Sequence, residues 1–112
     1  MNSMKSQSWK PIMDITKEGL EMFFKDYQVK CLEAIWATEE ALGSKAVWDA
    51  IEHERSRASV INFLESAYES GLLLRNLTTG KGGHRGMYRP AFDREGTKEH
   101  LKKMFKERLD TF

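Results

Sequence analysis

The sequence has few of the features that mark exported, membrane-bound or disulfide-linked proteins. It contains a single cysteine, Cys31, so no internal disulfide can form, and a reducing compartment such as the cytoplasm is expected. No apolar run approaches the ~18 residues that span a bilayer. The first seven residues lack the apolar stretch of a signal peptide. These absences predict a soluble, cytoplasmic protein with no membrane partner.

The spacings that assemble a catalytic or metal site are missing as well. His53, His84 and His100 stand in separate segments, with no H-E-x-x-H motif and no paired cysteines. The glycine-rich run GKGGHRG at 80–86 lacks the G-x-x-x-x-G-K-[ST] spacing of a phosphate-binding loop. We therefore expect no enzyme, no cofactor and no metal, and we expect Cys31 to be a small buried hydrophobe in a helix.

Charge is nearly balanced over the whole chain but unevenly distributed along it. The 18 basic and 17 acidic residues give a net charge of +1. Residues 14–54 carry ten acids against four lysines, a net of −6, whereas residues 55–94 carry seven bases against three acids, a net of +4. This asymmetry suggests that one face meets an anion. A solvated charge run is the alternative, and charge alone does not exclude it.

The apolar pattern predicts a single domain of helices and one hairpin. Helical spacing favours a short helix at 17–24 and longer helices at 26–39, 45–54, 57–70 and 94–112. Gly43 is expected to end a helix and Gly71 to end another in the left-handed conformation, while Ser44 and Ser56 are expected to cap the helices that follow them. Two strands, at 72–79 and 87–92, are expected to flank the basic glycine-rich loop 80–86.

This order of elements predicts an α+β, mostly helical fold. It corresponds to a winged helix-turn-helix, with a three-helix core and a β-hairpin wing. The expected division is an N-terminal extension at 1–25, partly disordered, a winged-helix domain at 26–94, and an added C-terminal helix at 95–112 that is a candidate dimerisation element.

Polar side chains on the third long helix and basic ones on the hairpin fit double-stranded DNA. Asn62 can bracket an adenine edge in the major groove, and small side chains beside it leave room for the approach. The alternatives are that a polar outer face is common to any surface helix and that the hairpin tip is merely flexible and basic. The candidate DNA-binding residues are Arg55, Arg57, Ala58, Ser59, Asn62, Ser66, Lys81, His84 and Arg85.

Four segments together resemble the penicillinase-repressor family of winged-helix regulators. They are YQV…IW within 27–36, SKAVWDAI at 44–51, RASVINFL…GLL within 57–73, and GMYRP at 86–90. The resemblance implies a dimeric repressor that reads the major groove with Ser59 and Asn62 and grips the DNA backbone with Lys81 and Arg85. The chain departs from the family in its short C-terminal region and in lacking the cysteine-rich motif of the copper-sensing members.

The prediction is therefore a sequence-specific transcriptional regulator, expected to repress and to bind DNA as a homodimer. An apolar stripe on the last helix is the candidate dimer contact, and the alternative is that it packs on its own domain. The stripe contains Leu101, Met104, Phe105 and Leu109. The alternative function is a winged helix that binds another protein within a transcription complex, using the acidic front half. No effector domain is recognisable, so a sensed ligand stays unknown.

Overall fold

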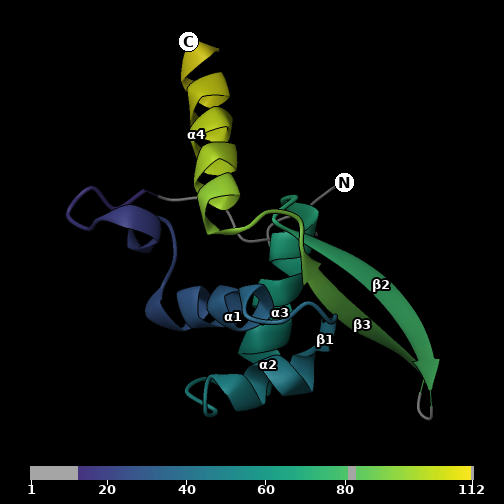
Figure 1. The fold of residues 1–112 in the computed structure, drawn as a ribbon. Helices are drawn as coiled ribbons and strands as arrows, with labels where there is room; N and C mark the ends of the chain where they lie inside the picture. Colours follow the sequence, from purple (N-terminus) through teal and green to yellow (C-terminus); the bar gives the residue numbers. More distant parts are fainter. Residues whose placement is uncertain (1–12, 81–82, 112) are drawn as a thin grey trace, which may run out of the picture.

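The computed structural model describes residues 13–80 and 83–111 of the chain. The elements in chain order are η2 (Gly19–Met22), α1 (Asp26–Trp36), β1 (Leu42–Gly43), α2 (Ser44–Ala50), α3 (Arg57–Glu69), β2 (Leu73–Gly80), β3 (Gly83–Pro90) and α4 (Arg94–Asp110). Helices α1 to α3 gather into one body, the hairpin of β2 and β3 projects from its side, and α4 rises from the top (Figure 1). The fold is α+β, as expected, and this arrangement is compatible with a winged helix.

The core forms where the apolar faces of the three bundled helices meet. On α3, Val60, Phe63, Leu64 and Ala67 recur at the three- and four-residue spacing of one helix face, and all four are buried. Helix α1 contributes Val29, Leu32 and Ile35, and α2 contributes Val47. Each large side chain buried in this way stabilises the fold by about 1.5–3 kcal/mol. The helical spacing in the sequence therefore identified the core faces correctly.

Two of the expected signals for helix ends are confirmed around α3. The hydroxyl of Ser56 accepts a hydrogen bond from the backbone N–H of Ser59 at 3.1 Å and so caps the start of the helix. After the helix, Gly71 has a φ of 85°, a left-handed conformation that a residue without a Cβ adopts at little cost.

Helix α2 is shorter than expected at its C-terminal end. The predicted helix at 45–54 stops at Ala50, because Glu52 and His53 both take positive φ values of 58°. The resulting turn is held by the Trp48 indole, whose N–H donates to the carbonyl of Arg55 at 2.8 Å. The His53 ring stacks on the same indole at a centroid distance of 3.6 Å. A tertiary contact thus overrides the local helical pattern.

The expected helix end at Gly43 and the expected cap at Ser44 are both wrong, because α1 already ends at Trp36 and Gly43 belongs to a short strand, β1, that was not predicted. The N-cap of α2 is Gly43 and has no side-chain cap bond, since Ser44 is already the first helical residue. Leu42 and Gly43 instead pair with Tyr88 and Met87 of β3. Two residues are too few to show strand alternation, so only the pairing with a distant strand reveals this element.

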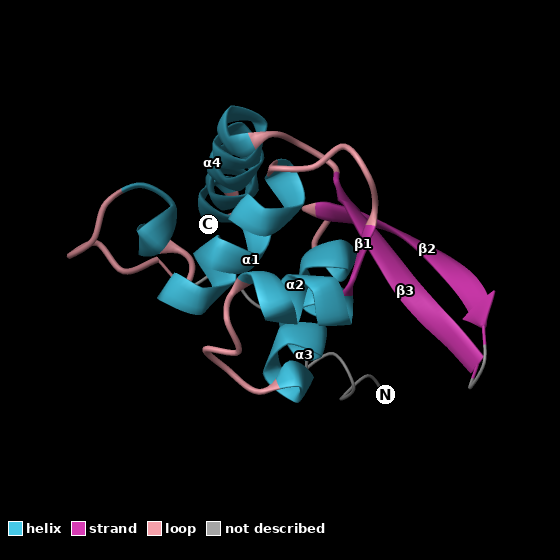
Figure 2. Cartoon of the chain, turned by 60° about the horizontal axis from the view of Figure 1, so that its bottom comes forward, coloured by secondary structure: helices cyan, strands magenta, loops and turns pink. Residues whose placement is uncertain are grey.

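The three strands form an antiparallel sheet in the order β1-β3-β2. The β2–β3 ladder runs from Leu73 opposite Pro90 to Gly80 opposite Gly83. Much of the segment expected to be a loop at 80–86 is therefore strand, because a backbone ladder needs no side chains; residues 81–82 lie outside the described part. The paired strands extend well beyond the helices (Figure 2).

Residues before α1 and after β3 add to the same core. Leu20 and Phe24 are buried, and the ring of Phe23 lies 5.1 Å from that of Phe105 on α4. The indole of Trp36 donates to the carbonyl of Phe92 at 2.9 Å, which ties the end of α1 to the start of α4. The division at residues 25 and 94 stays a prediction, and residues 1–12 lie outside the described residues.

Within residues 13–80 and 83–111, none of the helices combines the length and the apolar character that crossing a membrane requires.

Candidate nucleic-acid interface

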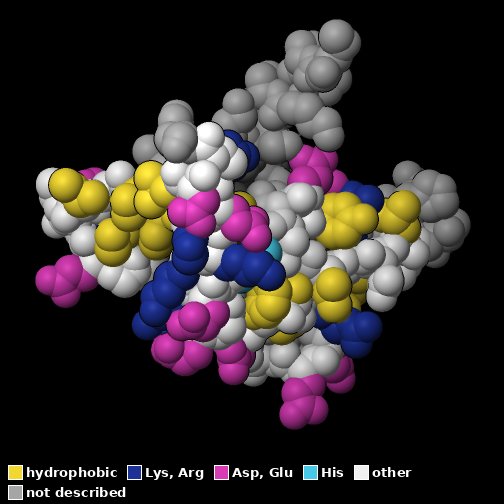
Figure 3. Space-filling model, turned by 90° about the horizontal axis from the view of Figure 1, so that it is seen from above, with side chains coloured by type: hydrophobic (Ala, Val, Ile, Leu, Met, Phe, Trp, Pro, Cys, Tyr) yellow, Lys and Arg dark blue, Asp and Glu magenta, His cyan; other side chains and the backbone are white. Residues whose placement is uncertain are grey.

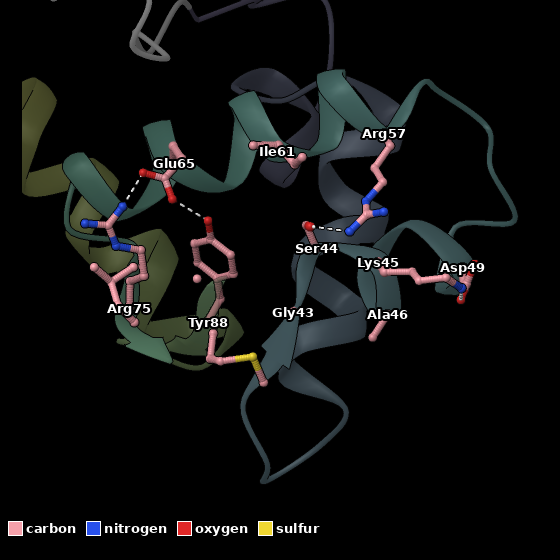
Figure 4. A pocket seen from close by; sticks show the side chains of 13 residues that line it. Gly43, Ser44, Lys45, Ala46, Asp49, Arg57, Ile61, Glu65, Arg75 and Tyr88 are labelled. Carbon is pink, nitrogen blue, oxygen red and sulfur yellow. Dashed lines mark hydrogen bonds and ion pairs between the residues drawn. The ribbon is translucent and has the colours of Figure 1, made fainter. Parts of the chain in front are cut away.

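A groove of about 700 Å³ lies between the start of α2, the outer side of α3 and the facing side of the sheet. Figure 4 shows that Arg57, Ile61 and Glu65 line it along α3, while Tyr88 faces them from β3. These three α3 residues are four apart, so they form one row along the helix. The remaining lining residues are Gly43, Ser44, Lys45, Ala46, Asp49, Arg75, Leu77, Gly86 and Met87.

One end of the groove, which we call the closed end, is a satisfied polar network of Glu65, Arg75 and Tyr88. The guanidinium of Arg75 forms an ion pair with one carboxylate oxygen of Glu65, and the hydroxyl of Tyr88 donates to the other. The Arg75 guanidinium also lies 4.3 Å from the centre of the Tyr68 ring. Burial, followed by the bond to Glu65, raises the pKa of Tyr88 well above its usual 10. This network joins α3 to both long strands.

Gly86 gives the Tyr88 ring the space that this network needs. A Cβ added at Gly86 would lie 2.8 Å from the Tyr88 hydroxyl oxygen and 3.0 Å from the ring carbon that bears it. Both distances are shorter than ordinary contacts, so a side chain at 86 would push the tyrosine away from Glu65. Gly86 therefore leaves the space that the side chain of Tyr88, two residues further along β3, occupies.

The other end, which we call the open end, consists of Ser44 and Lys45 at the start of α2 and Arg57 at the start of α3. The Arg57 guanidinium donates to the hydroxyl of Ser44 over 3.5 Å, a long bond to a neutral group. Lys45 pairs with Asp49 at 3.0 Å in an exposed i,i+4 arrangement. Such pairs contribute only about 0.3–0.5 kcal/mol, so they exchange readily for another anion. Positive charge is thus available at this end.

The outer face of α3 differs from the expected one in two positions. Ala58 and Asn62 are exposed, as expected, but Ser66 is only 5% exposed. The prediction that Ser66 faces DNA is therefore wrong, because its side chain is buried. Ile61, which is 37% exposed, and Glu65 line the groove instead. Ser59 is half-buried, and its hydroxyl lies 3.0 Å from that of Ser56 within the cap.

Arg55 lies in the turn before α3 and is exposed, with its guanidinium 4.9 Å from the centre of the Tyr27 ring. The charge of an arginine stacked on a ring in this way stays accessible to a phosphate. The structure therefore brings Arg55 and Arg57 to the same end of α3, as the sequence suggested.

Of the three basic residues expected at the hairpin tip, the structure describes only the backbone of two. Lys81 lies outside the described residues. His84 and Arg85 belong to β3, where they pair with Thr79 and Thr78, and their side chains lie outside the described part. The prediction that they contact DNA stays a prediction.

The apolar stripe on α4 is divided between the core and the surface. Leu101 is 1% exposed, so its place in a dimer contact is wrong, because the domain's own core already encloses it. Met104 and Phe105 are half-buried, with Met104 packed against the core and Phe105 against Phe23. Leu109 is 69% exposed. Only the outer part of the stripe is open to another chain.

Seen from above, where α4 points at the viewer, basic and acidic side chains are interspersed on the molecule (Figure 3). Three ion pairs along α4 account for part of this mixture: Glu95 with Lys98, Glu99 with Lys102, and Lys106 with Asp110. These pairs partly neutralise the basic side chains of α4, as Asp49 and Glu65 do for Lys45 and Arg75 in the groove. The groove side is the better candidate interface because Arg57, at its open end, has a neutral hydroxyl as its partner.

The described residues include no cluster of three or more His, Cys, Asp or Glu side chains able to hold a metal ion. Cys31 is fully buried, and burial raises the pKa of its thiol to about 12, which leaves it protonated near neutral pH. The thiol is thus a packing group, as the sequence predicted, and gives no sign of nucleophilic chemistry.

Sequence reasoning missed the parts of the groove that lie on the strands and on one row of α3. Arg75, Tyr88 and Gly86 were expected only as strand or loop residues, and Glu65 only as a charge. The four-residue spacing of Arg57, Ile61 and Glu65 was the available signal. Their facing partners could not be assigned without the register of the hairpin.

No family model and no curated protein matches this sequence. Among solved structures, the fold is similar to a protein described as a "possible transcriptional regulator" from Methanosarcina mazei Go1. The two share 11% sequence identity with a TM-score of 0.62, and the match covers 79% of this chain and 72% of the other. At this identity the likeness shows a shared fold. The expected membership of the penicillinase-repressor family stays a resemblance.

Proposed function

We propose that this protein is a winged helix-turn-helix regulator of transcription that binds double-stranded DNA through α3 and the hairpin. The observation that carries the proposal is the exposed first half of α3. It presents Arg57, Ala58, Ile61 and Asn62 with no acidic side chain among residues 57–62, beside the open end of the groove. In helix-turn-helix proteins, the first residues of the second helix reach the base edges.

The charges along α3 set the direction of approach. Its second half holds Glu65 and Glu69, and the first of these is already compensated by Arg75. The helix would therefore enter the major groove with its N-terminal end, where Arg55 and Arg57 meet phosphates. The hairpin would follow the backbone on one side. Similarity in fold to a possible transcriptional regulator agrees with this role.

The full chain, labelled and titrated with a mixed-sequence duplex, tests the proposal by fluorescence anisotropy at several salt concentrations. We expect the logarithm of affinity to fall linearly with the logarithm of salt, by about 0.9 for each phosphate contacted. Binding that ignores salt, or no binding to duplex, would contradict the proposal.

We further propose that the protein acts as a homodimer and represses by occupying a two-fold related site. The outer end of α4 is the candidate contact, because Leu109 is exposed there and Met104 and Phe105 lie along the same stripe. Light scattering of the full chain and of Leu109→Glu tests this contact: the variant is expected to be monomeric. Removal of all residues from 95 onward would be a poor test, since Thr97 and Leu101 belong to the core.

The second candidate is a winged helix that binds another protein. It is favoured by Leu77 on β2, which is 57% exposed and lines the same groove as the exposed Ile61 of α3. Exposed apolar side chains that gather in one groove can mark a protein contact. The same titration separates the two functions, because a protein-binding module gives no steep salt dependence with duplex DNA.

A further inference from the structure

Ile61 is the exposed aliphatic residue on the reading half of α3, and the DNA-binding function proposed above does not by itself explain it. The neighbouring Val60 and Leu64 are fully buried, whereas Ile61 is 37% exposed and lies in the middle of the groove wall. In Figure 4 it stands between Arg57 and Glu65 on α3, and its hydrocarbon side chain has no group that can form a hydrogen bond. Its contribution to DNA binding must therefore come from apolar contact.

Two residues beside Ile61 complete a small recognition surface. Ala58 is three positions before it and Asn62 directly follows, and Ala58 and Asn62 are themselves four apart. Ala58 is thus one helical turn from each of the other two and lies between them on the exposed side of α3, while Ile61 and Asn62 themselves stand about 100° apart around the helix. The surface thus combines methyl groups with one amide that can both donate and accept.

An A·T base pair presents the matching chemistry in the major groove. Thymine is the base that carries a methyl group there, and adenine offers the acceptor and donor that an asparagine amide can pair with. Guanine is usually read by arginine or lysine and cytosine by a carboxylate. The carboxylate one turn beyond Ile61 on α3, that of Glu65, is occupied on both oxygens by Arg75 and Tyr88.

We propose that Ile61, with Ala58 beside it, recognises the C5-methyl group of thymine, next to an adenine that Asn62 reads. This inference rests on the proposed DNA binding. It adds that the protein favours thymine at one position and recognises that base by its C5-methyl group. Specificity for this base pair therefore comes from apolar contact with one methyl group, and that methyl group can be removed from the DNA without changing base pairing.

Replacing thymine by deoxyuridine tests the inference directly. A preferred duplex is first selected from a random library with the full chain, and each thymine in it is then exchanged singly for deoxyuridine. We expect one or two exchanges to weaken binding about fourfold, the worth of one buried methyl group. Exchanges outside the selected site should leave affinity unchanged.

Variants assign the effect to Ile61. Ile61→Ala is expected to bind the thymine and deoxyuridine duplexes equally, and Ile61→Val to retain part of the difference. Asn62→Ala is the matched control, expected to bind more weakly overall but to keep the fourfold ratio. Because Ile61 is outside the core, its variants should unfold at the wild-type temperature, which circular dichroism checks.

The outcomes of these experiments distinguish failure of methyl recognition from failure of the proposed DNA binding. If wild-type protein binds every deoxyuridine duplex as well as the thymine duplex, or if Ile61→Ala keeps the sensitivity, methyl recognition by Ile61 is overturned while DNA binding stands. If the chain shows no salt-dependent binding to any duplex, the proposed function fails and the inference falls with it.

Discussion

The two ends of the groove each contain an arginine, and the two arginines differ in whether their partner is charged. At the closed end, Arg75 is paired with Glu65 and stacked on Tyr68, so its charge is already compensated within the fold. At the open end, the partner of Arg57 is a neutral hydroxyl at 3.5 Å, and the guanidinium stays exposed. Both arginines contributed equally to the +4 segment of the sequence. The difference teaches that net charge along a chain overstates the charge that a partner can meet.

The comparison also separates stability from binding. The closed end ties α3 to the sheet through Glu65, Arg75 and Tyr88, so substitutions there are expected to act on folding. The open end makes only exposed contacts, so substitutions there are expected to act on DNA affinity. The following changes test this separation, from the largest expected effect to the smallest.

Gly86→Ala should lower the free energy of unfolding by about 1–3 kcal/mol, because the added Cβ overlaps the Tyr88 hydroxyl. Denaturation by urea measures the effect. The control is the same change in a Tyr88→Leu background, where the loss should largely disappear. An equal loss in both backgrounds would show that Gly86 serves the backbone and not the tyrosine.

Arg57→Ala should weaken DNA binding about tenfold on all sequences, as expected for the loss of one charge-assisted phosphate contact. The salt dependence of binding should fall by about one unit of slope. Arg75→Ala is the matched control and should change affinity less than about twofold while lowering stability. If Arg75→Ala weakens binding as much as Arg57→Ala, the distinction between the two ends is wrong.

Tyr88→Phe should lower stability by about 1 kcal/mol at neutral pH through loss of the bond to Glu65. The pKa of Tyr88 is raised in the folded protein, so this contribution is complete below pH 10 and is lost as the pH rises above it. Unfolding curves of both proteins between pH 7 and pH 11 should therefore converge at the alkaline end. A gap that stays constant or widens would contradict the assignment.

Lys45→Ala should have the smallest effect on folding, about 0.3–0.5 kcal/mol, because its pair with Asp49 is exposed. Thermal unfolding at low and high salt measures it. The difference between wild type and variant should vanish at high salt, where the pair is screened.

The sequence predicted the helical body better than the sheet and the groove. The stripes of α1 and α3, the Ser56 cap and the left-handed Gly71 depend on neighbours within a few residues, and all of them are confirmed. The strand β1 and the early end of α2 were missed, since each depends on a partner elsewhere in the fold. Features that depend on residues close in the sequence could thus be predicted, and features that depend on distant partners could not.

The candidate site divides in the same way. The exposed positions of Arg57, Ala58 and Asn62 follow from helical spacing and were predicted. Ser66 was misplaced because spacing alone does not say where the buried arc of α3 ends, and the structure encloses it. The network of Glu65, Arg75 and Tyr88 joins three elements, and a single sequence holds no signal for such a pairing.

The order β1-β3-β2 has a consequence for how the molecule folds. Strands β2 and β3 follow each other along the chain, so their hairpin can form locally within microseconds. Leu42 in β1 must find Tyr88 far along the chain, with α2 and α3 in between, so this pairing has a larger loop-closure entropy to overcome than the hairpin has. We therefore expect the two-residue strand β1 to join the sheet last, after α2 and α3 have packed. The open end of the groove would then be the final part of the protein to take shape during folding.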